Sequence, residues 1–180
     1  LRFDEAVKRD LLSDYKVLVI AVDELHVSQV LNQRIADSGD ELKLDDAVKI
    51  VGCWNGLGKH VAAEDGMDIS ADPQAMRTAI AFAQSIKHSK LLTAEFERIS
   101  NDLADKIDYL PALEAKHVDG TMNVVERNQK LSWLKGNIGK DEPVCRILTN
   151  ARCLSEGVDV PALDAAIFLN PRDSVVDVVQ

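Results

Sequence analysis

Several features that mark other classes of protein are missing from this sequence of 180 residues. No apolar run approaches the roughly 20 residues needed to span a bilayer. The opening LRFDEAVKRD mixes both charge signs, where a signal peptide would carry an apolar core. The three cysteines, Cys53, Cys145 and Cys153, lack C-x-x-C spacing and suit a reducing compartment. These absences favour a soluble, cytoplasmic protein with no membrane partner.

Positive charge and aromatic side chains are also scarce. The chain holds 21 Lys and Arg against 30 Asp and Glu, a net charge of -9, and aromatic residues make up 4% of it. A module that coats nucleic acid is normally basic, so only local positive patches are compatible with such a role. No nucleophile–base pair, metal-ligand cluster or intact Gly-rich fingerprint is recognisable, which disfavours an independent small-molecule enzyme.

The composition, at 46% hydrophobic and 28% charged residues, is that of one globular domain long enough to bury a hydrophobic core. We therefore expect a single domain over residues 1–180. The chain begins at Leu1 without a methionine and stops at Gln180 inside the amphipathic-looking run SVVDVVQ. Both ends look cut, which predicts a fragment of a larger protein.

Continuous runs of β-branched and aliphatic residues predict five strands, buried within a sheet. The runs are YKVLVIAV at 15–22, RTAIAFAQ at 77–84, ALEAKHVD at 112–119, VCRILTN at 144–150 and AAIFLN at 165–170. Helical patterns lie between most of them. This alternation predicts an α/β fold with a parallel sheet flanked by helices and right-handed crossovers.

The expected helices differ in how clearly they are marked. Two cover about residues 24–36 and 44–61, and a third spans 123–136, where Asn in place of Ser or Thr and a Glu three residues later resemble a capping box. A long helix follows the second strand. Its apolar face is expected to hold four residues at helical spacing: Leu92, Phe96, Ile99 and Leu103.

The stretch ILTNARCLSEGVDVPALDAAIFL, residues 147–169, places a polar loop between two expected strands. A turn needs only a Gly or Pro with one or two polar residues, so this loop carries more chemistry than its geometry demands. Polar segments also follow the second and third strands, as AQSIKHSK and HVDGTMN. Because ligands gather at the carboxyl ends of parallel strands, these three segments are expected to form one surface.

The three polar segments, in this order, resemble motif IV, its following segment and motif V of superfamily-two helicases. The likeness covers roughly residues 76–180 and is most specific in EGVDVPALD…IFL.P..S..D..Q. Within the superfamily, the chain looks like the second RecA-like lobe of restriction-endonuclease-type helicases and translocases, including predicted helicases fused to methyltransferases. The opening FDEAVKRDLLSDYKVLV similarly resembles the connection out of the first lobe.

The resemblance implies roles for particular residues. Gly157 and Asp159 would lie at the ATP cleft between the two lobes, and Gln180 would be the first residue of motif VI, Q-x-x-G-R-x-x-R. Thr149 and Asn150 would face the nucleic-acid backbone. Without the family, Asp159 could simply cap a turn in which Gly157 supplies a positive φ.

One position departs from the family pattern. An acidic residue commonly follows the threonine of motif V, and Arg152 stands nearby instead. We include Arg152 among the expected nucleic-acid contacts.

The family also implies ATP and Mg²⁺ as cofactors of the parent protein, and DNA and the first RecA-like lobe as partners. The phosphate loop, the acidic Mg²⁺ motif and the motif VI arginines are absent from this sequence. Phosphoryl transfer depends on positioning and electrostatics shared by both lobes. The fragment alone is therefore expected to bind no cofactor and to hydrolyse no ATP.

The residues of the first two polar segments also suggest phosphate contacts on their own. Ser85 would begin a helix whose free N–H groups attract anions, with Lys87 in its first turn. Gly120 and Thr121 offer backbone N–H and hydroxyl donors. Ordinary helix caps explain the same residues, and both roles can hold together. No aromatic residue is interleaved for base stacking, so contact would be to the backbone and would not read sequence.

Other suggestive patterns are assigned structural roles. GCWNGLGKH lacks the first glycine of G-x-x-x-x-G-K-[ST], because Cys53 stands there, and the segment lies in a helical stretch. His117 and Asp119 could share a strand face with a metal ion, but the sequence places no third ligand. VDEL at 22–25 is expected to start the first helix.

A rival interpretation is a stand-alone acidic α/β module that docks on or scaffolds a protein partner through the carboxyl edge of its sheet. The net charge of -9 favours it, and the two cut-looking ends oppose it. Under either interpretation, residues 24–75 fit a helical insertion or connecting region to which the sequence assigns no role.

Overall fold

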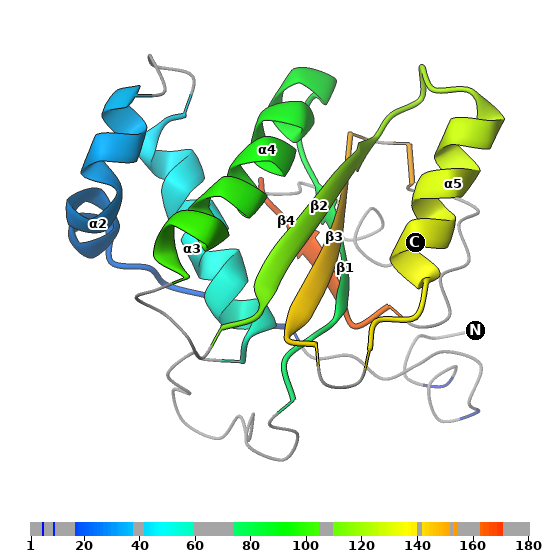
Figure 1. The fold of residues 1–180 in the computed structure, drawn as a ribbon, viewed down its shortest axis with the longest axis horizontal. Coiled ribbons are helices and arrows are strands. Elements are labelled where there is room, and N and C mark those ends of the chain that lie inside the picture. The colour runs from blue at the N-terminus through cyan, green and yellow to red at the C-terminus, as the bar shows by residue number, and fades with distance from the viewer. Residues whose placement is uncertain are drawn as a thin grey trace.

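A computed structural model describes residues 5, 9, 17–37, 42–59, 74–104, 110–139, 142–151, 153–154 and 163–170. Over residues 78–150 helices and strands alternate, as the apolar patterning predicts (Figure 1). In chain order the elements are α2 (Glu24–Asp37), α3 (Leu44–Leu57), β1 (Thr78–Phe82), α4 (Ile86–Leu103), β2 (Ala112–Val118), α5 (Val124–Lys135), β3 (Val144–Asn150) and β4 (Ala165–Phe168).

The four described strands form one parallel sheet in the order β2-β3-β1-β4. β3 lies inside the sheet: Ala115 of β2 and Ala79 of β1 both align with its Ile147. The α/β fold with a parallel, helix-flanked sheet is therefore confirmed. Because every strand runs the same way, the segments that follow β1, β2 and β3 emerge at one edge, at the top of Figure 1.

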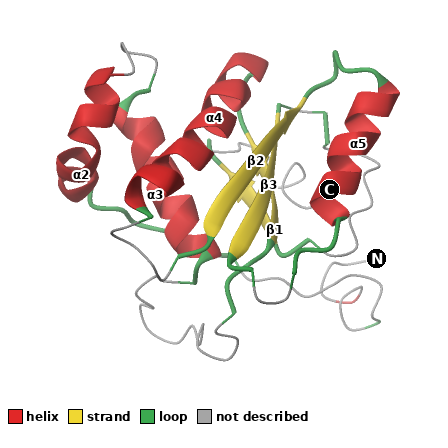
Figure 2. Cartoon of the chain, viewed as in Figure 1, coloured by secondary structure: helices red, strands yellow, loops and turns green. Residues whose placement is uncertain are grey.

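Helices cover both faces of the sheet, and the hydrophobic core on one face is larger than the core on the other. α2, α3 and α4 lie on one side, and α5 lies on the other (Figure 2). The larger core, between α2–α4 and the sheet, includes the four α4 residues expected from helical spacing, all at most 3% exposed: Leu92, Phe96, Ile99 and Leu103. The smaller core, under α5, is built around Ile80, Val118, Leu134 and Leu148.

Local signals explain where several helices begin and end. The Asp23 carboxylate accepts hydrogen bonds from the backbone N–H groups of Leu25 (2.9 Å) and His26 (3.3 Å), so VDEL does start α2. α3 ends at Leu57, earlier than the sequence predicted. Gly58 and then Lys59, at φ 59°, carry the chain out of the helix.

The strand predicted at 15–22 is wrong over the part that the structure describes. Residues 17–23 have no strand structure, and the Val17 and Val19 side chains are 64% and 91% exposed. The segment lies instead against α3. A Cβ on Gly52 would come within 2.7 Å of Val22 Cγ2, and one on Gly56 within 2.5 Å of Ile20 Cδ1. Because these two glycines, one turn apart, carry no side chains, the segment can pack closely against α3.

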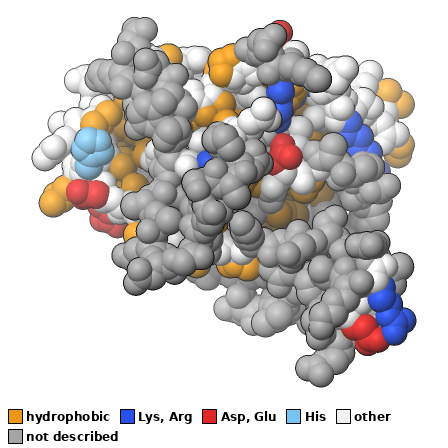
Figure 3. Space-filling model, turned by 90° about the horizontal axis from the view of Figure 1, so that it is seen from below, with side chains coloured by type: hydrophobic (Ala, Val, Ile, Leu, Met, Phe, Trp, Pro, Cys, Tyr) orange, Lys and Arg blue, Asp and Glu red, His pale blue; other side chains and the backbone are white. Residues whose placement is uncertain are grey.

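Figure 3 views the edge at which the strands begin, where apolar side chains show between scattered charged ones and atoms of undescribed residues. Among the described helices, none combines the length and apolar character that crossing a membrane requires.

Candidate functional site: the carboxyl rim

The carboxyl rim, defined here as residues 83–90, 119–121 and 149–151, brings together the three segments that the sequence singled out. Sheet order places the end of β3 between the ends of β2 and β1. Lys90 Nζ on α4 lies 3.8 Å from Asp119 Oδ2 after β2, which links two of the segments directly. The three segments therefore lie next to one another at one edge of the sheet.

The start of α4 has the features of an anion-binding helix end. Ser85 is its N-cap, and its hydroxyl accepts a hydrogen bond from His88 N at 3.1 Å, so the capping role is confirmed. The first turn contains no acidic residue. Lys87, in that turn, is exposed. A partial positive charge, free N–H groups and a lysine therefore coincide.

The turn after β2 is organised by one buried carboxylate. Asp119 is 1% exposed and accepts hydrogen bonds from the backbone N–H of Thr121 (2.8 Å), from the Thr121 hydroxyl and from His117. These bonds, with the Thr121 hydroxyl contributing most, hold the pKa of Asp119 well below its usual 3.8. Asp119 is thus ionised at neutral pH and fixes the turn.

Gly120 and Thr121 are both exposed at the tip of this turn. A Cβ added at Gly120 would meet nothing within 4 Å, so the backbone there is open to a ligand. α5 follows with Asn123 as its N-cap, accepting from Glu126 N at 2.9 Å. The capping interpretation of this segment is confirmed for Asn123, while phosphate contact by Gly120 and Thr121 stays a prediction.

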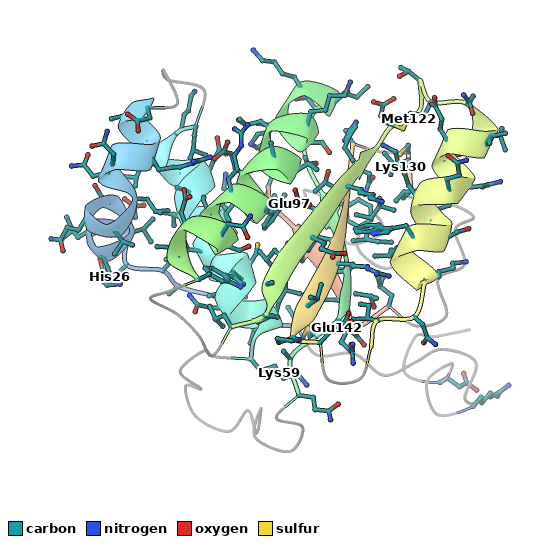
Figure 4. All side chains as sticks on the ribbon, in the orientation of Figure 1. His26, Lys59, Glu97, Met122, Lys130 and Glu142 are labelled. Atoms are coloured by element: carbon teal, nitrogen blue, oxygen red, sulfur yellow. The ribbon has the colours of Figure 1, made fainter. Side chains whose placement is uncertain are left out.

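His117 and Asp119 contact each other directly. His117 Nε2 lies 2.8 Å from Asp119 Oδ2, and Lys130 of α5 donates a hydrogen bond to the His117 carbonyl at 2.6 Å (Figure 4). Burial lowers the pKa of His117 below 6.5, and its hydrogen bond with Asp119 and the charge of that carboxylate only partly oppose this. Within the described part of the chain, no three His, Cys, Asp or Glu side chains gather closely enough to hold a metal ion.

Thr149 and Asn150 lie at the end of β3 and are both 0% exposed. Thr149 Oγ1 lies 2.9 Å from Ser89 Oγ and also contacts the Thr93 hydroxyl. Asn150 donates a hydrogen bond to the Ala81 carbonyl at 3.2 Å. Both side chains therefore point into the protein, and their expected contact with nucleic acid stays a prediction.

The sequence did not single out Ser89 and Thr93, although both bond to Thr149. Ser89 is fully buried on the same face of α4 as Leu92 and Phe96. A hydroxyl inside an apolar stripe was the available signal, because a buried hydroxyl needs a partner. The expected cleft residues Gly157, Asp159 and Gln180 lie outside the described residues, and so does Arg152.

Comparisons with known proteins agree with this arrangement. The family model described as "Helicase conserved C-terminal domain" matches residues 63–180. The solved structure "ATP-dependent Type ISP restriction-modification enzyme LlaBIII bound to DNA" is similar at 38% sequence identity and a TM-score of 0.78. That match covers 99% of this chain and 11% of the other chain. A search of curated proteins found no match.

These matches confirm the resemblance to the second lobe of superfamily-two helicases and its RecA-like fold. The family model begins after α3, whereas the likeness to the solved structure includes α2 and α3 as well. From the extent of both matches, the chain belongs to the helicase conserved C-terminal domain family.

Proposed function

We propose that this chain acts as the second RecA-like lobe of an ATP-dependent DNA helicase or translocase, and that its carboxyl rim contacts the DNA backbone. The observation that carries the proposal is the likeness over 99% of the chain to an enzyme whose structure is described as bound to DNA. The chain spans only 11% of that enzyme. The activity, the ATP and the DNA are therefore attributed to a larger protein.

The rim supplies suitable chemistry for a phosphate backbone. The start of α4 offers free N–H groups and the exposed Lys87. Gly120 and Thr121, which are also exposed, follow β2 at the same edge of the sheet. Such donors position a strand without reading its sequence. The overall charge of -9 does not oppose this, because the contact is local and the first turn of α4 holds no acidic residue.

Thr149 and Asn150 enter the proposal as the buried support of the exposed rim residues, because both side chains are buried and bonded inside the protein. Arg152 keeps its expected role as a contact to the backbone. The rim side chains that would touch DNA directly are thus those of α4 and of the turn after β2.

ATP and Mg²⁺ are proposed to bind between this lobe and the first lobe of the same parent protein. The support is the family and the relative's description as ATP-dependent. Gly157 and Asp159 would line the cleft, so Gly157→Val and Asp159→Ala should each abolish ATP hydrolysis in a complete protein that contains this chain. If a variant hydrolyses ATP at the full rate, the residue that it replaces is not part of the ATP site.

DNA binding by the chain itself tests the first part. Fluorescence anisotropy with a labelled duplex, between about 50 and 200 mM salt, should show weak binding that falls as salt rises. Lys87→Ala should weaken binding and reduce the slope of log K against log salt by about 1. Arg98→Ala is the matched control, because it removes an exposed cation about three turns further along the same helix.

Equal loss in both variants would mean that net charge alone governs binding, and would contradict the rim as the contact surface. No binding even at the lowest salt would favour the rival protein-docking module.

A cytoplasmic location is part of the same proposal. Cys53, Cys145 and Cys153 are all free thiols in the structure, which suits a reducing compartment.

A further inference from the structure

A chain of buried polar side chains runs beneath the exposed residues of the rim, from the turn after β2 to the end of β3. His117 Nε2 lies 2.8 Å from Asp119 Oδ2, and His117 Nδ1 lies 2.8 Å from Ser89 Oγ. Ser89 Oγ in turn lies 2.9 Å from Thr149 Oγ1. At most 7% of any of these four residues is exposed. The series joins β2, α4 and β3, each of which borders or contains part of one rim segment.

The charge on Asp119 sets the direction of the hydrogen bonds. An ionised carboxylate only accepts, so His117 must present a proton on Nε2 to Asp119. Ser89 Oγ lies 2.8 Å from His117 Nδ1 and donates its single hydroxyl proton to Thr149 Oγ1, while the Thr149 hydroxyl donates to the Ser89 carbonyl. At its outer end, Asp119 also holds the exposed Thr121 through two hydrogen bonds. The position of the Thr121 turn is therefore linked to the hydroxyl orientation of Thr149.

We propose that His117 is a positioning residue that couples the DNA-facing turn at Thr121 to Thr149, at the end of β3 and ahead in the sequence of Gly157 and Asp159. The relay consists of Thr121, Asp119, His117, Ser89 and Thr149. Its link to DNA rests on the proposed function, whereas the internal coupling does not. Only a side chain with two ring nitrogens bridges the carboxylate and the hydroxyl here, because each nitrogen bonds to a different partner.

The first test uses the ¹⁵N-labelled chain without DNA. Thr121→Val removes one bond to Asp119, and we expect it to shift the amide signals of both Asp119 and Thr149. In a His117→Gln background, Gln can still donate to Asp119 but no longer reaches Ser89, so the shift at Thr149 should be lost. His117→Asn breaks the opposite link, because it retains an acceptor toward Ser89 and releases Asp119; the shift at Thr149 should again be lost.

Ser100→Ala provides the matched control. Ser100 is a buried hydroxyl on the same helix, 2% exposed, and it bonds to Glu97 and Leu113 outside the relay. In this background the Thr121→Val shift at Thr149 should persist. An unchanged shift in both His117 variants, or its loss in Ser100→Ala, would overturn the coupling.

Two measurements on the unmodified chain keep the proposal independent of how the variants fold. Long-range ¹H–¹⁵N correlation should find a proton on His117 Nε2, and a bare Nε2 would overturn the relay. Adding duplex DNA should shift the signals of Thr121 and Thr149 together. A shift at Thr121 alone would overturn the relay and leave DNA binding intact. If the Thr121→Val result holds while DNA moves neither signal, the proposed function fails and the relay stands.

Discussion

Two aliphatic runs in this chain look alike as sequence and end in different surroundings. VCRILTN forms β3 inside the sheet, with β2 on one side and β1 on the other. The run at 17–22 is at least as rich in β-branched residues but forms no strand and lies against α3. Strand propensity describes a fit to a pleated, packed surface more than a backbone preference. The neighbours of a run therefore decide whether it joins the sheet.

The contacts of the two runs show how the neighbours differ. Ile147 of β3 aligns with residues on both adjacent strands and is fully buried. In the other run, Ile20 and Val22 meet Gly56 and Gly52 of α3, while Val19 on the opposite side is 91% exposed. One run is enclosed on all sides, and the other is covered on one.

The largest expected effect comes from truncating the enclosed run. Ile147→Ala should lower the free energy of unfolding by about 2–5 kcal/mol, because it removes a fully buried side chain and leaves a cavity. Val19→Ala, at an exposed position, should change it by less than about 0.5 kcal/mol. Urea denaturation of both variants measures the difference. A comparable loss in Val19→Ala would mean that the outer side of this run is covered in solution.

The next largest expected effect is a loss of stability in acid. It should involve β3 and not the run at 17–22, because the end of β3 is connected to His117 through Ser89. Burial lowers the pKa of His117 below 6.5, so the unfolded chain takes up a proton more readily than the folded one. Stability should therefore fall as the pH drops below about 6.5, with a slope of at most about 1.4 kcal/mol per pH unit for one proton. Lys90 and Lys130 also act to lower this pKa.

Subtracting the pH profile of His117→Asn from that of the unmodified chain isolates this contribution, since the other histidines are common to both. The low pKa of Asp119 acts in a separate window: its contribution is complete above pH 3.8 and is lost as the pH falls through the pKa of the folded state. Identical profiles between pH 5 and 7 would show that His117 is not held neutral by folding.

The sequence correctly predicted the elements that have long apolar patterns and are buried in the fold. β3 was placed at its observed bounds, and the apolar stripe of α4 was read from spacing alone. The strand prediction failed at 17–22, because apolar runs on a sheet and on a helix surface have the same composition. Gly52 and Gly56 were the missed signal: small residues four apart on a helix face permit close approach of another segment.

The candidate site was predictable in position but not in the direction of its side chains. Parallel topology alone places Ser85, Lys87, Gly120 and Thr121 at one edge, and the first two are confirmed there at the start of α4. Whether the polar groups that end β3 face solvent or the interior depends on α4, packed on the sheet. Ser89 supplies a partner for Thr149 within the core, and no pattern along β3 itself reveals that partner.

The smallest effect tests whether α3 is what holds the exposed run. Gly52→Leu places a side chain where a Cβ alone would already lie 2.7 Å from Val22 Cγ2, so the segment at 17–22 must lift away. The packing lost by this segment destabilises the fold, whereas replacing a helical glycine by an ordinary residue stabilises it by roughly 0.8–1.0 kcal/mol. The net change in unfolding free energy should therefore be under about 1 kcal/mol, although hydrogen exchange at Ile20 and Val22 should accelerate. Unchanged exchange there would mean that the run is held by a surface other than α3. Faster hydrogen exchange in β3 of the same variant would contradict the separation of the two runs.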